Sequence, residues 1–509
     1  RLKMTFGLRL DRPIYHEDPL ENPAITALTL PDKNGNPTHY NTGKWPKSTF
    51  YWSPRVGFRW DPEGNKVMIV RGGTGLFTGK IPFVWLTNMP TNSGMYQFGA
   101  AVSDPAQLQN FLFDPNPAAH RSKFPSEAGT SVPSAGIVLI DPDFKFPQVW
   151  RTNLAFDRSF GNGWMLTMEA LYTKDVNAVR MRNANQKEPN DALAGPDNRP
   201  RFNPADNTNR RLYPGINNAI VLENSSKGGG FSFTTQISKT MARGLSGSIA
   251  YTYTFVQDIT PNPGSQAASV WSANPTTGTQ NDIQLAYSQY AVPHRIVGTV
   301  SYRFEYLKHL ATTVSLYYEG APQGVFSYAY NGDVNGDGNA GSVDLMYIPR
   351  DPSEIIFVDQ APSATTDAYT AQEQSDAFFR YLEQDKYLRK HKGQYAERNG
   401  ARFPWYHRLD FKLLQDIFTD IGNRKHTLQL SVDVLNFANL INKHWGIRKQ
   451  LNYTNGFQSN PLVFAGYNAS GQPTFRMAQV EKKLVTETFS NVKNVSTTWG
   501  LQVGLRYIF

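Results

Sequence analysis

The feature that most constrains the fold is an alternation of apolar and polar residues, which returns along most of the chain. Near the last residues, Leu501, Val503 and Leu505 are apolar, whereas Gln502 and Arg506 are polar. Successive side chains of a strand point to opposite faces, so each such stretch predicts a strand with one apolar face and one wet face. We expect about twelve strands of roughly ten residues each, the length that a tilted transmembrane strand requires.

The connections between these strands alternate between short and long. Short turns are expected at residues 61–65, 160–163, 241–244, 305–309 and 418–425. Long polar excursions occupy residues 14–48, 80–146, 180–228, 258–290, 320–402 and 438–496. Short turns at one rim and long loops at the other are typical of an outer-membrane β-barrel with its short side in the periplasm. A soluble domain seldom carries so many long loops, so the loops favour a barrel over a soluble β-sandwich.

Charge and hydropathy agree with this interpretation. The mean hydropathy of −0.47 and the lack of an apolar run of about 18 residues exclude a helical membrane protein. The net charge of +9 is spread along the chain without a basic cluster, which argues against a nucleic-acid partner. The charges expected on the inward faces are Arg55, Arg59, Arg151, Asp157, Glu169, Arg295, Arg303, Glu319, Arg408, Asp410, Lys412, Asp433 and Arg506. At mid-depth in lipid an Arg or Lys costs about 2–4 kcal/mol, so they imply a wet or plugged interior.

The expected fold is therefore all-β, an antiparallel transmembrane β-barrel with long extracellular loops. Residues 1–509 form the C-terminal part of one transmembrane barrel domain in this interpretation. The alternating pattern is already under way at Leu2, Met4 and Phe6. We therefore expect the last twelve strands of a larger barrel, of the size of the 22-stranded plugged transporters, with the plug and first strands upstream.

A twelve-residue segment from Asp333 to Asp344 has the spacing of a Ca²⁺-binding loop. Asp333, Asn335, Asp337 and Asp344 supply side-chain oxygens at positions 1, 3, 5 and 12. A glycine stands at position 6, and Asn339 can offer its backbone carbonyl at position 7. The alternative is a chain of Asx turns in a solvent-exposed loop. We expect a structural Ca²⁺ ion that orders the excursion of residues 320–402 at the cell surface.

Two further segments of the excursions have local signatures. Thr370 and Glu373 form a capping box, which predicts a surface helix that ends by Gly393. This helix could be a lid, a docking surface for a lipoprotein, or a helix that packs the loop down. The excursion of residues 80–146 holds Phe83, Trp85, Tyr96, Phe98, Phe111 and Phe113. These aromatic side chains could stack on a ligand or form a small core of the loop itself.

Signatures of enzymes fail in this sequence. The segment from Gly73 to Lys80 lacks the first glycine of a phosphate-binding loop and the Ser or Thr after the lysine. The nine His show no metal-ligand spacing, and the absence of Cys excludes thiol catalysis and disulfides. We therefore expect no enzymatic activity.

Several longer segments resemble a known family. Residues 53–79 (SPRVGFRWDPEGNKVMIVRGGTGLFTG), 330–349, 387–405 and 426–446 look like the C-terminal barrel half of TonB-dependent transporters of Bacteroidota. Within that family the chain is most similar to the Oar-like, carboxypeptidase-regulatory-like branch. The terminal WGLQVGLRYIF resembles the last strand of outer-membrane proteins, in which the final aromatic residue, here Phe509, is an assembly signal.

The resemblance implies a location in the outer membrane and the active import of a large nutrient, such as an oligosaccharide or a peptide. Energy would come from TonB through the N-terminal part and its plug. Outer-membrane lipid would surround the barrel, and a surface lipoprotein or a larger outer-membrane complex is a possible partner. The alternative is a structural subunit of an outer-membrane assembly for adhesion, secretion or barrel insertion, which transports nothing itself. The third class, a barrel enzyme, lacks a catalytic constellation.

Overall fold

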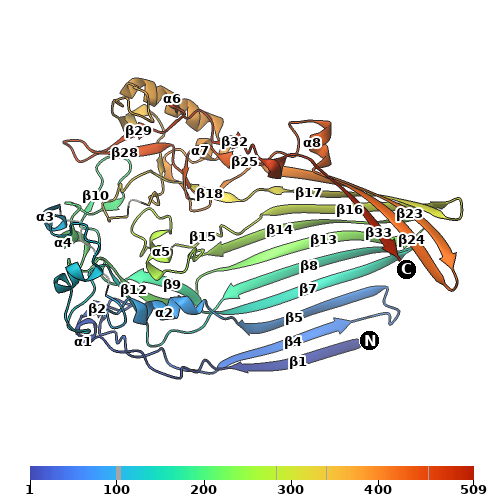
Figure 1. Ribbon diagram of the computed structural model, residues 1–509, viewed down its shortest axis with the longest axis horizontal. Coiled ribbons are helices and arrows are strands. Elements are labelled where there is room, and N and C mark those ends of the chain that lie inside the picture. The colour runs from blue at the N-terminus through green and yellow to red at the C-terminus, as the bar shows by residue number, and fades with distance from the viewer. Residues whose placement is uncertain (99–104, 243, 283, 340, 457) are drawn as a thin grey trace.

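The protein consists of a wall of long antiparallel strands and a folded cap at one end of it (Figure 1). The computed structural model describes residues 1–509 apart from 99–104, 243, 283, 340 and 457. In spatial order the wall contains β1 (Leu2–Asp11), β4 (Tyr51–Trp60), β5 (Met68–Thr78), β7 (Gln148–Gly161), β8 (Trp164–Asp175), β13 (Gly229–Ala242), β14 (Leu245–Asp258), β16 (His294–Tyr306), β17 (Leu310–Pro322), β23 (Trp405–Ile421), β24 (Arg424–Leu435) and β33 (Gly500–Ile508). A short strand, β15 (Ala286–Tyr287), adds to β14. The expected all-β fold with about twelve long strands is confirmed.

The two faces of the wall differ as the alternation predicts. Leu501, Val503 and Leu505 on β33 are 59%, 62% and 71% exposed. Leu505 lies directly opposite Leu430 of β24, which is also exposed, so the apolar face continues from strand to strand. Gln502 pairs with Asp433, which belongs to the charged face. Exposed apolar side chains in continuous rows fit a lipid environment, and the polar face is left for the interior.

Ion pairs join neighbouring strands across the charged face. Arg71 of β5 contacts Asp157 of β7 at 3.0 Å, and Lys412 of β23 contacts Asp433 of β24 at 2.8 Å. Arg303 Nη1 of β16 lies 2.6 Å from Asp416 Oδ2, two strands away on β23. Several of the charges that the sequence assigns to the inward face therefore have a partner of opposite sign on the wall.

The hairpin turns lie at one end of the wall and the cap at the other (Figure 1). Gly64, Gly163 and Gly422 occupy these turns with φ of 73°, 80° and 65°, values that glycine adopts without strain. The turn expected at residues 241–244 includes Arg243, which lies outside the described residues. The loop that begins at Asp333 follows β17 and β18 (Val325–Tyr328) into the cap, as the topology of short turns and long loops requires.

The six excursions are folded, and they build the cap from small sheets and short helices. Three sheets have three or more strands: β6 (Ile137–Ile140), β12 (Ala219–Ser225) and β9 (Ala178–Asn183); β22 (Ala401–Arg402), β18, β27 (Gln458–Ser459) and β26 (Thr454–Asn455); and β20 (Ile356–Phe357), β29 (Pro473–Met477) and β28 (Leu462–Tyr467). The two-stranded sheets pair β2 (Leu30–Pro31) with β3 (Pro37–Thr38), β10 (Asp191–Ala192) with β11 (Pro200–Arg201), β19 (Tyr347–Ile348) with β21 (Gln394–Tyr395), β25 (Lys449–Leu451) with β32 (Phe489–Asn491), and β30 (Gln479–Val480) with β31 (Lys483–Leu484). The α-helices are α1 (Pro23–Thr26), α2 (Phe83–Thr91), α3 (Pro105–Leu108), α4 (Asn207–Arg210), α5 (Ala267–Ser272), α6 (Ala371–Gln384), α7 (Lys386–Lys390) and α8 (Phe437–Ile441).

The largest buried cluster of the cap forms around aromatic side chains of two excursions. Tyr328, Tyr330 and Phe378 come from residues 320–402, and Phe475 comes from residues 438–496. The rings of Tyr330 and Phe475 stack with their centroids 4.7 Å apart. These contacts are far apart in sequence, so the cap has a hydrophobic core of its own.

The surface helix predicted in the excursion of residues 320–402 is confirmed as α6. The Thr370 side chain accepts from the Glu373 backbone, and the Glu373 side chain accepts from the Thr370 backbone, which is the complete capping box. The helix ends at Gln384, and the side chain of the next residue, Asp385, caps a second helix, α7. The helical segment therefore has a break that the spacing of its apolar residues did not predict.

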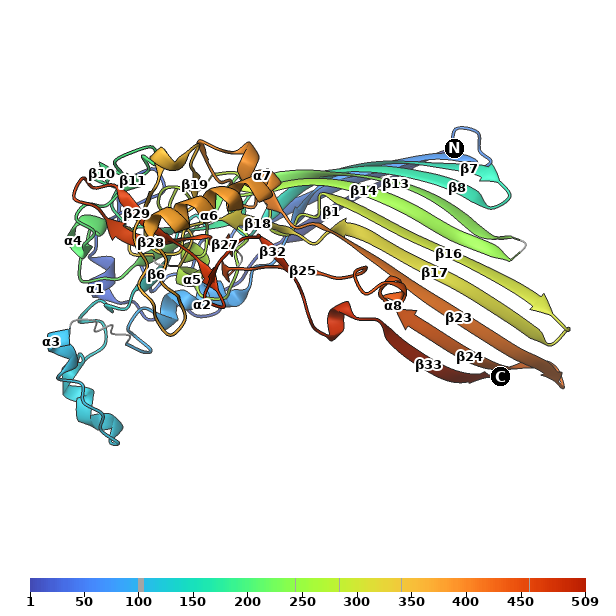
Figure 2. The same ribbon diagram turned by 90° about the horizontal axis from the view of Figure 1, so that it is seen from above.

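Figure 2 shows that the wall curves without closing on itself. In the part of the chain that the structure describes, β1 pairs only with β4 and β33 only with β24. Both strands are therefore edges of the sheet, and their outward N–H and C=O groups have no strand beside them.

None of the described helices is long and apolar enough to cross a lipid bilayer.

Candidate functional site

The predicted Ca²⁺ loop lies inside the cap, between β18 and β19. The Tyr330 backbone donates to the Asp344 carbonyl, and residues 329 and 345 form a β-bridge that closes the base of the loop. Thr276, from the excursion of residues 258–290, forms a parallel bridge with Asp344 on the other side. The loop is thus clamped between two segments and does not hang free from the cap.

The acidic side chains of the loop turn inward and accept hydrogen bonds from its backbone. Asp333 accepts from the N–H groups of Asp337 (3.0 Å) and Gly338 (2.8 Å). Asp344 Oδ2 accepts from Val334 N at 2.7 Å, and Asp337 Oδ1 accepts from Asn339 N at 2.7 Å. Gly338 has a φ of 91°, so the sharp turn expected at position 6 is present.

These carboxylates are buried close to one another. Asp337 and Asp344 are only 8% and 1% exposed, and Asn335 is 1% exposed. Burial, followed by the neighbouring Asp344 and Asp333, raises the pKa of Asp337 well above its ordinary value. Burial also raises the pKa of Asp344 to about 7, with Arg199 opposing and Asp333 reinforcing the shift. Anions in such a place destabilise one another unless a cation compensates them.

Two arginines of the excursion of residues 180–228 supply part of that compensation. Arg210 Nη2 lies 3.9 Å from Asp333 Oδ2, and its Nε donates to the Gly336 carbonyl at 2.6 Å. Arg199 is fully buried and forms an ion pair with Asp197 at 2.9 Å. Because Arg199 already pairs with Asp197, only part of the positive charge of Arg199 is available to the three loop carboxylates.

The donor set fits a hard cation, since it consists of carboxylate, amide and carbonyl oxygens from one short loop. Among the described residues, no group of three or more His, Cys, Asp or Glu is arranged to hold a metal ion. The oxygens therefore lie near one another but would need to converge further around an ion. The backbone hydrogen bonds agree equally with a chain of Asx turns.

The loop is also a junction of three excursions. Asn335 Nδ2 donates to the Gly278 carbonyl and Asn339 Nδ2 donates to the Ser272 carbonyl, each at 2.7 Å. The Phe202 backbone donates to the Asn335 carbonyl at 2.8 Å. Ordering this loop would therefore order residues 180–228, 258–290 and 320–402 together.

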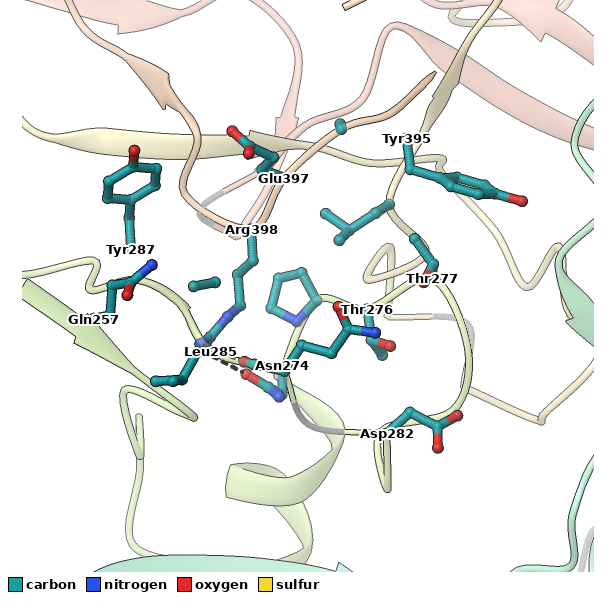
Figure 3. A pocket seen from close by; sticks show the side chains of 15 residues that line it. Gln257, Asn274, Thr276, Thr277, Asp282, Leu285, Tyr287, Tyr395, Glu397 and Arg398 are labelled. Atoms are coloured by element: carbon teal, nitrogen blue, oxygen red, sulfur yellow. Dashed lines mark hydrogen bonds between the residues drawn. The ribbon is translucent and has the colours of Figure 1, made fainter. Parts of the chain in front are cut away.

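A cavity of about 390 Å³ with polar and apolar lining residues lies beside this junction (Figure 3). Arg398 enters it and donates through Nη1 to Asn274 Oδ1 at 3.0 Å, while Nη2 lies 3.3 Å from Asp258 Oδ1. Tyr287 and Tyr395 stand at opposite sides of the cavity in this view. The guanidinium of Arg398 is 4% exposed and holds β14 to the cap, so it serves the architecture and not a ligand. The sequence carried no local sign of this cluster, because its residues come from separate excursions.

The aromatic residues of the excursion of residues 80–146 and the terminal Phe509 lie in different environments. Trp85 is buried in a cluster with Tyr51 and Phe146, whereas Phe83, Tyr96 and Phe113 are exposed. The aromatic residues of 80–146 are thus divided between a core role and an exposed role. Phe509 is 74% exposed, and its ring stacks on Tyr507 with 5.7 Å between centroids.

Comparison with known proteins gives a family and a set of similar folds. A family model described as an outer membrane beta barrel domain matches residues 1–444. The chain is similar to the outer membrane transporter YddB from Escherichia coli, with 11% identity over 91% of this chain and 41% of that one and a TM-score of 0.38. It is also similar to a mutant of the ferric enterobactin receptor PfeA from Pseudomonas aeruginosa, with 9% identity over 83% of this chain and 38% of that one and a TM-score of 0.35. The FrpB iron transporter from Neisseria meningitidis is 11% identical over 85% of this chain and 38% of that one, with a TM-score of 0.33. The chain spans about two fifths of the length of these structures. A search of curated proteins found no match.

Proposed function

Because the chain belongs to the outer membrane beta barrel domain family, we propose that it is the C-terminal part of a TonB-dependent transporter that imports a large nutrient. The protein lies in the outer membrane, and its long strands form the wall of the pore. Upstream residues would supply the remaining strands of a 22-stranded barrel and a plug that couples to TonB. The resemblance of its sequence segments supports the further proposal that the transporter belongs to the Oar-like branch of Bacteroidota.

Two features of the wall carry this proposal: it has an apolar face and a charged face, and the sheet ends in two open edges. Unpaired N–H and C=O groups in hydrocarbon cost several kcal/mol each, by general estimates of about 2–7 kcal/mol. The outer edges of β1 and β33 would therefore need partner strands in the membrane. A charged interior is also what a polar plug requires as its contact surface.

Binding of TonB tests the proposal directly. The full-length protein, purified in detergent, should bind the periplasmic domain of TonB in a titration, and a variant without its N-terminal TonB-contacting segment should not. If the full-length protein fails to bind TonB but co-purifies in a stable complex with other outer-membrane proteins, the structural-subunit alternative is supported instead. We propose no catalytic role.

We further propose that the loop from Asp333 to Asp344 binds one structural Ca²⁺ ion through Asp333, Asn335, Asp337, Asp344 and the Asn339 carbonyl. Its support is geometric: two buried carboxylates, those of Asp337 and Asp344, lie near the half-buried Asp333 in one loop at the junction of three excursions. Mg²⁺ would fit poorly, because it demands tight octahedral geometry and keeps its waters. The ion would order the cap and would take no part in chemistry.

Calorimetry on the full-length protein tests this second proposal. We expect one Ca²⁺ to bind with a Kd in the weak half of the range of about 10⁻⁷–10⁻³ M known for such loops. The Asp344→Asn variant should lose the binding heat. Asp376→Asn is the control, because Asp376 is exposed on α6 and accepts a hydrogen bond from Gln372 of the same helix. Equal binding by both variants, or no binding by the wild type, would refute the metal site.

A further inference from the structure

An open cavity of about 450 Å³ lies on the charged face of the wall, directly below the cap. Arg295 is the second residue of β16, Glu319 lies near the end of β17, and Arg408 lies near the start of β23. These strand ends are the ends next to the cap, because the opposite ends of β16 and β17 meet in a short hairpin turn. The excursions contribute Tyr290 and Arg448. The cavity therefore faces the mouth of the pore.

Three guanidinium groups line this cavity, and two of them have acidic partners. Arg295 Nη2 lies 2.7 Å from Glu319 Oε1, and Arg408 Nη2 lies 2.7 Å from Asp410 Oδ2. The third, on Arg448, lies over the ring of Tyr406 at 5.0 Å from its centroid. Among the described residues no ion pair or side-chain hydrogen bond engages the Arg448 guanidinium, so its five donors remain available.

The charges of the lining do not cancel. The lining residues carry three Arg and a single acid, Glu319, which gives 3 − 1 = +2. Asp410 reduces the field near Arg408 but does not line the cavity. Arginine binds carboxylate, sulfate and phosphate through paired N–H donors, and it does so best where water is partly excluded. A concave site with an excess of arginine therefore selects an oxyanion.

The remaining lining can contact a ring that bears hydroxyl groups. Tyr290 lines the cavity and is 68% exposed, and its hydroxyl donates to the Pro261 carbonyl at 3.4 Å. Thr252 and Thr254 present hydroxyl groups from β14. A pyranose ring packs its C–H face on an aromatic side chain, and its hydroxyl groups exchange hydrogen bonds with such hydroxyls.

From these observations we propose that this cavity binds an acidic saccharide unit of the imported substrate, with its carboxylate at Arg448 and Arg295 and its ring against Tyr290. The proposal rests on the proposed function, because it makes the cavity a binding site at the entrance of the pore. Glu319 has the opposite effect: it competes with the ligand for Arg295 and limits the affinity. The chemistry is reversible binding, and no bond is made or broken.

The experiment is a binding titration of trigalacturonate to the full-length protein in detergent at low salt. Arg448→Gln should weaken binding about tenfold, the loss expected for one charge-assisted contact. Glu319→Gln should tighten binding several-fold, because Arg295 is then released while Tyr317 keeps a hydrogen-bond partner. Arg59→Gln is the matched control and should have no effect, since Arg59 is an inward arginine of β4 near the opposite rim.

Two readouts separate this proposal from its alternatives. The fully methyl-esterified trimer should bind at least about tenfold more weakly than trigalacturonate, because its charge is removed. Equal binding of the ester, equal weakening by Arg59→Gln and Arg448→Gln, or tighter binding of triglutamate than of trigalacturonate would overturn the proposal. TonB binding is measured on the same samples. If the wild type binds TonB but no saccharide, only the proposed saccharide site is refuted. If the wild type does not bind TonB, the proposed transporter function is refuted.

Discussion

Replacing Glu223 by Gln should loosen the cap, because Glu223 is the shared counter-charge of two arginines in a small buried sheet. Glu223 lies on β12 and is 1% exposed. Its carboxylate accepts from Arg182 Nε of β9 at 3.1 Å, and it lies 3.4 Å from Arg180 Nε on the same strand. Burial lowers the pKa of Arg180, and the negative charge of Glu223 opposes that shift.

The size of the effect follows from these contacts. Two unit charges 4 Å apart attract by about 4 kcal/mol at an effective dielectric constant of about 20. Gln keeps the shape and an acceptor oxygen but leaves both cations without their counter-ion. Removing one partner of a buried pair typically costs about 3–5 kcal/mol. At about 1.4 kcal/mol for each tenfold change, the open state of this sheet should become more populated by a hundredfold or more.

Limited proteolysis of the full-length protein in detergent measures this opening, because cleavage follows the population of the open state when reclosing is fast. The variant should be cleaved within residues 180–228 at least about a hundredfold faster than the wild type. Glu188→Gln is the control, because Glu188 is exposed in the same excursion. If both variants are cleaved at the same rate, the buried charge cluster does not hold the cap together and the reasoning fails.

Two further predictions concern the wall and the helix of the cap. Leu430→Arg places a cation on the lipid face of β24 and should cost about 2–4 kcal/mol of folding free energy in bilayers. Gln429→Arg, on the opposite face, should cost little, and equal costs for the two variants would contradict the assigned faces. Thr370→Ala removes the capping box and should cost about 1 kcal/mol, seen as faster hydrogen exchange at the first turn of α6; unchanged exchange there would contradict the assigned cap.

The wall could be predicted from the sequence because its information is local. The spacing of Leu501, Val503 and Leu505 already determines which side of β33 is apolar, since a shift by one residue would exchange the faces. The capping box of Thr370 and Glu373 was equally local, and it identified the start of α6. The break at Asp385 was missed because the apolar residues on its two sides continue at nearly helical spacing.

The cap could not be predicted to the same extent, because its contacts join distant segments. In the sheet of β6, β12 and β9, Ile137 pairs with Ala219, which lies in a different excursion. No pattern within either segment indicates that pairing. The cavity of Arg295, Arg408 and Arg448 has the same origin: two of these arginines were expected on the inward face, but Arg448 comes from a loop whose position only the fold determines. The spacing from Asp333 to Asp344 indicated the candidate ligands of the proposed Ca²⁺ site, whereas the clamp by Thr276 appeared only in three dimensions.

The most direct test of the central claim asks which side of β33 faces lipid. The chain contains no Cys, so single Cys variants at positions 502 and 503 can each carry one spin label without background labelling. In the full-length protein in bilayers, the label at 503 should be accessible to oxygen dissolved in hydrocarbon and hidden from a water-soluble paramagnetic reagent. The label at 502 should show no such lipid exposure. The reverse result, or an aqueous environment at both positions, would contradict the account of this sheet as the wall of an outer-membrane barrel.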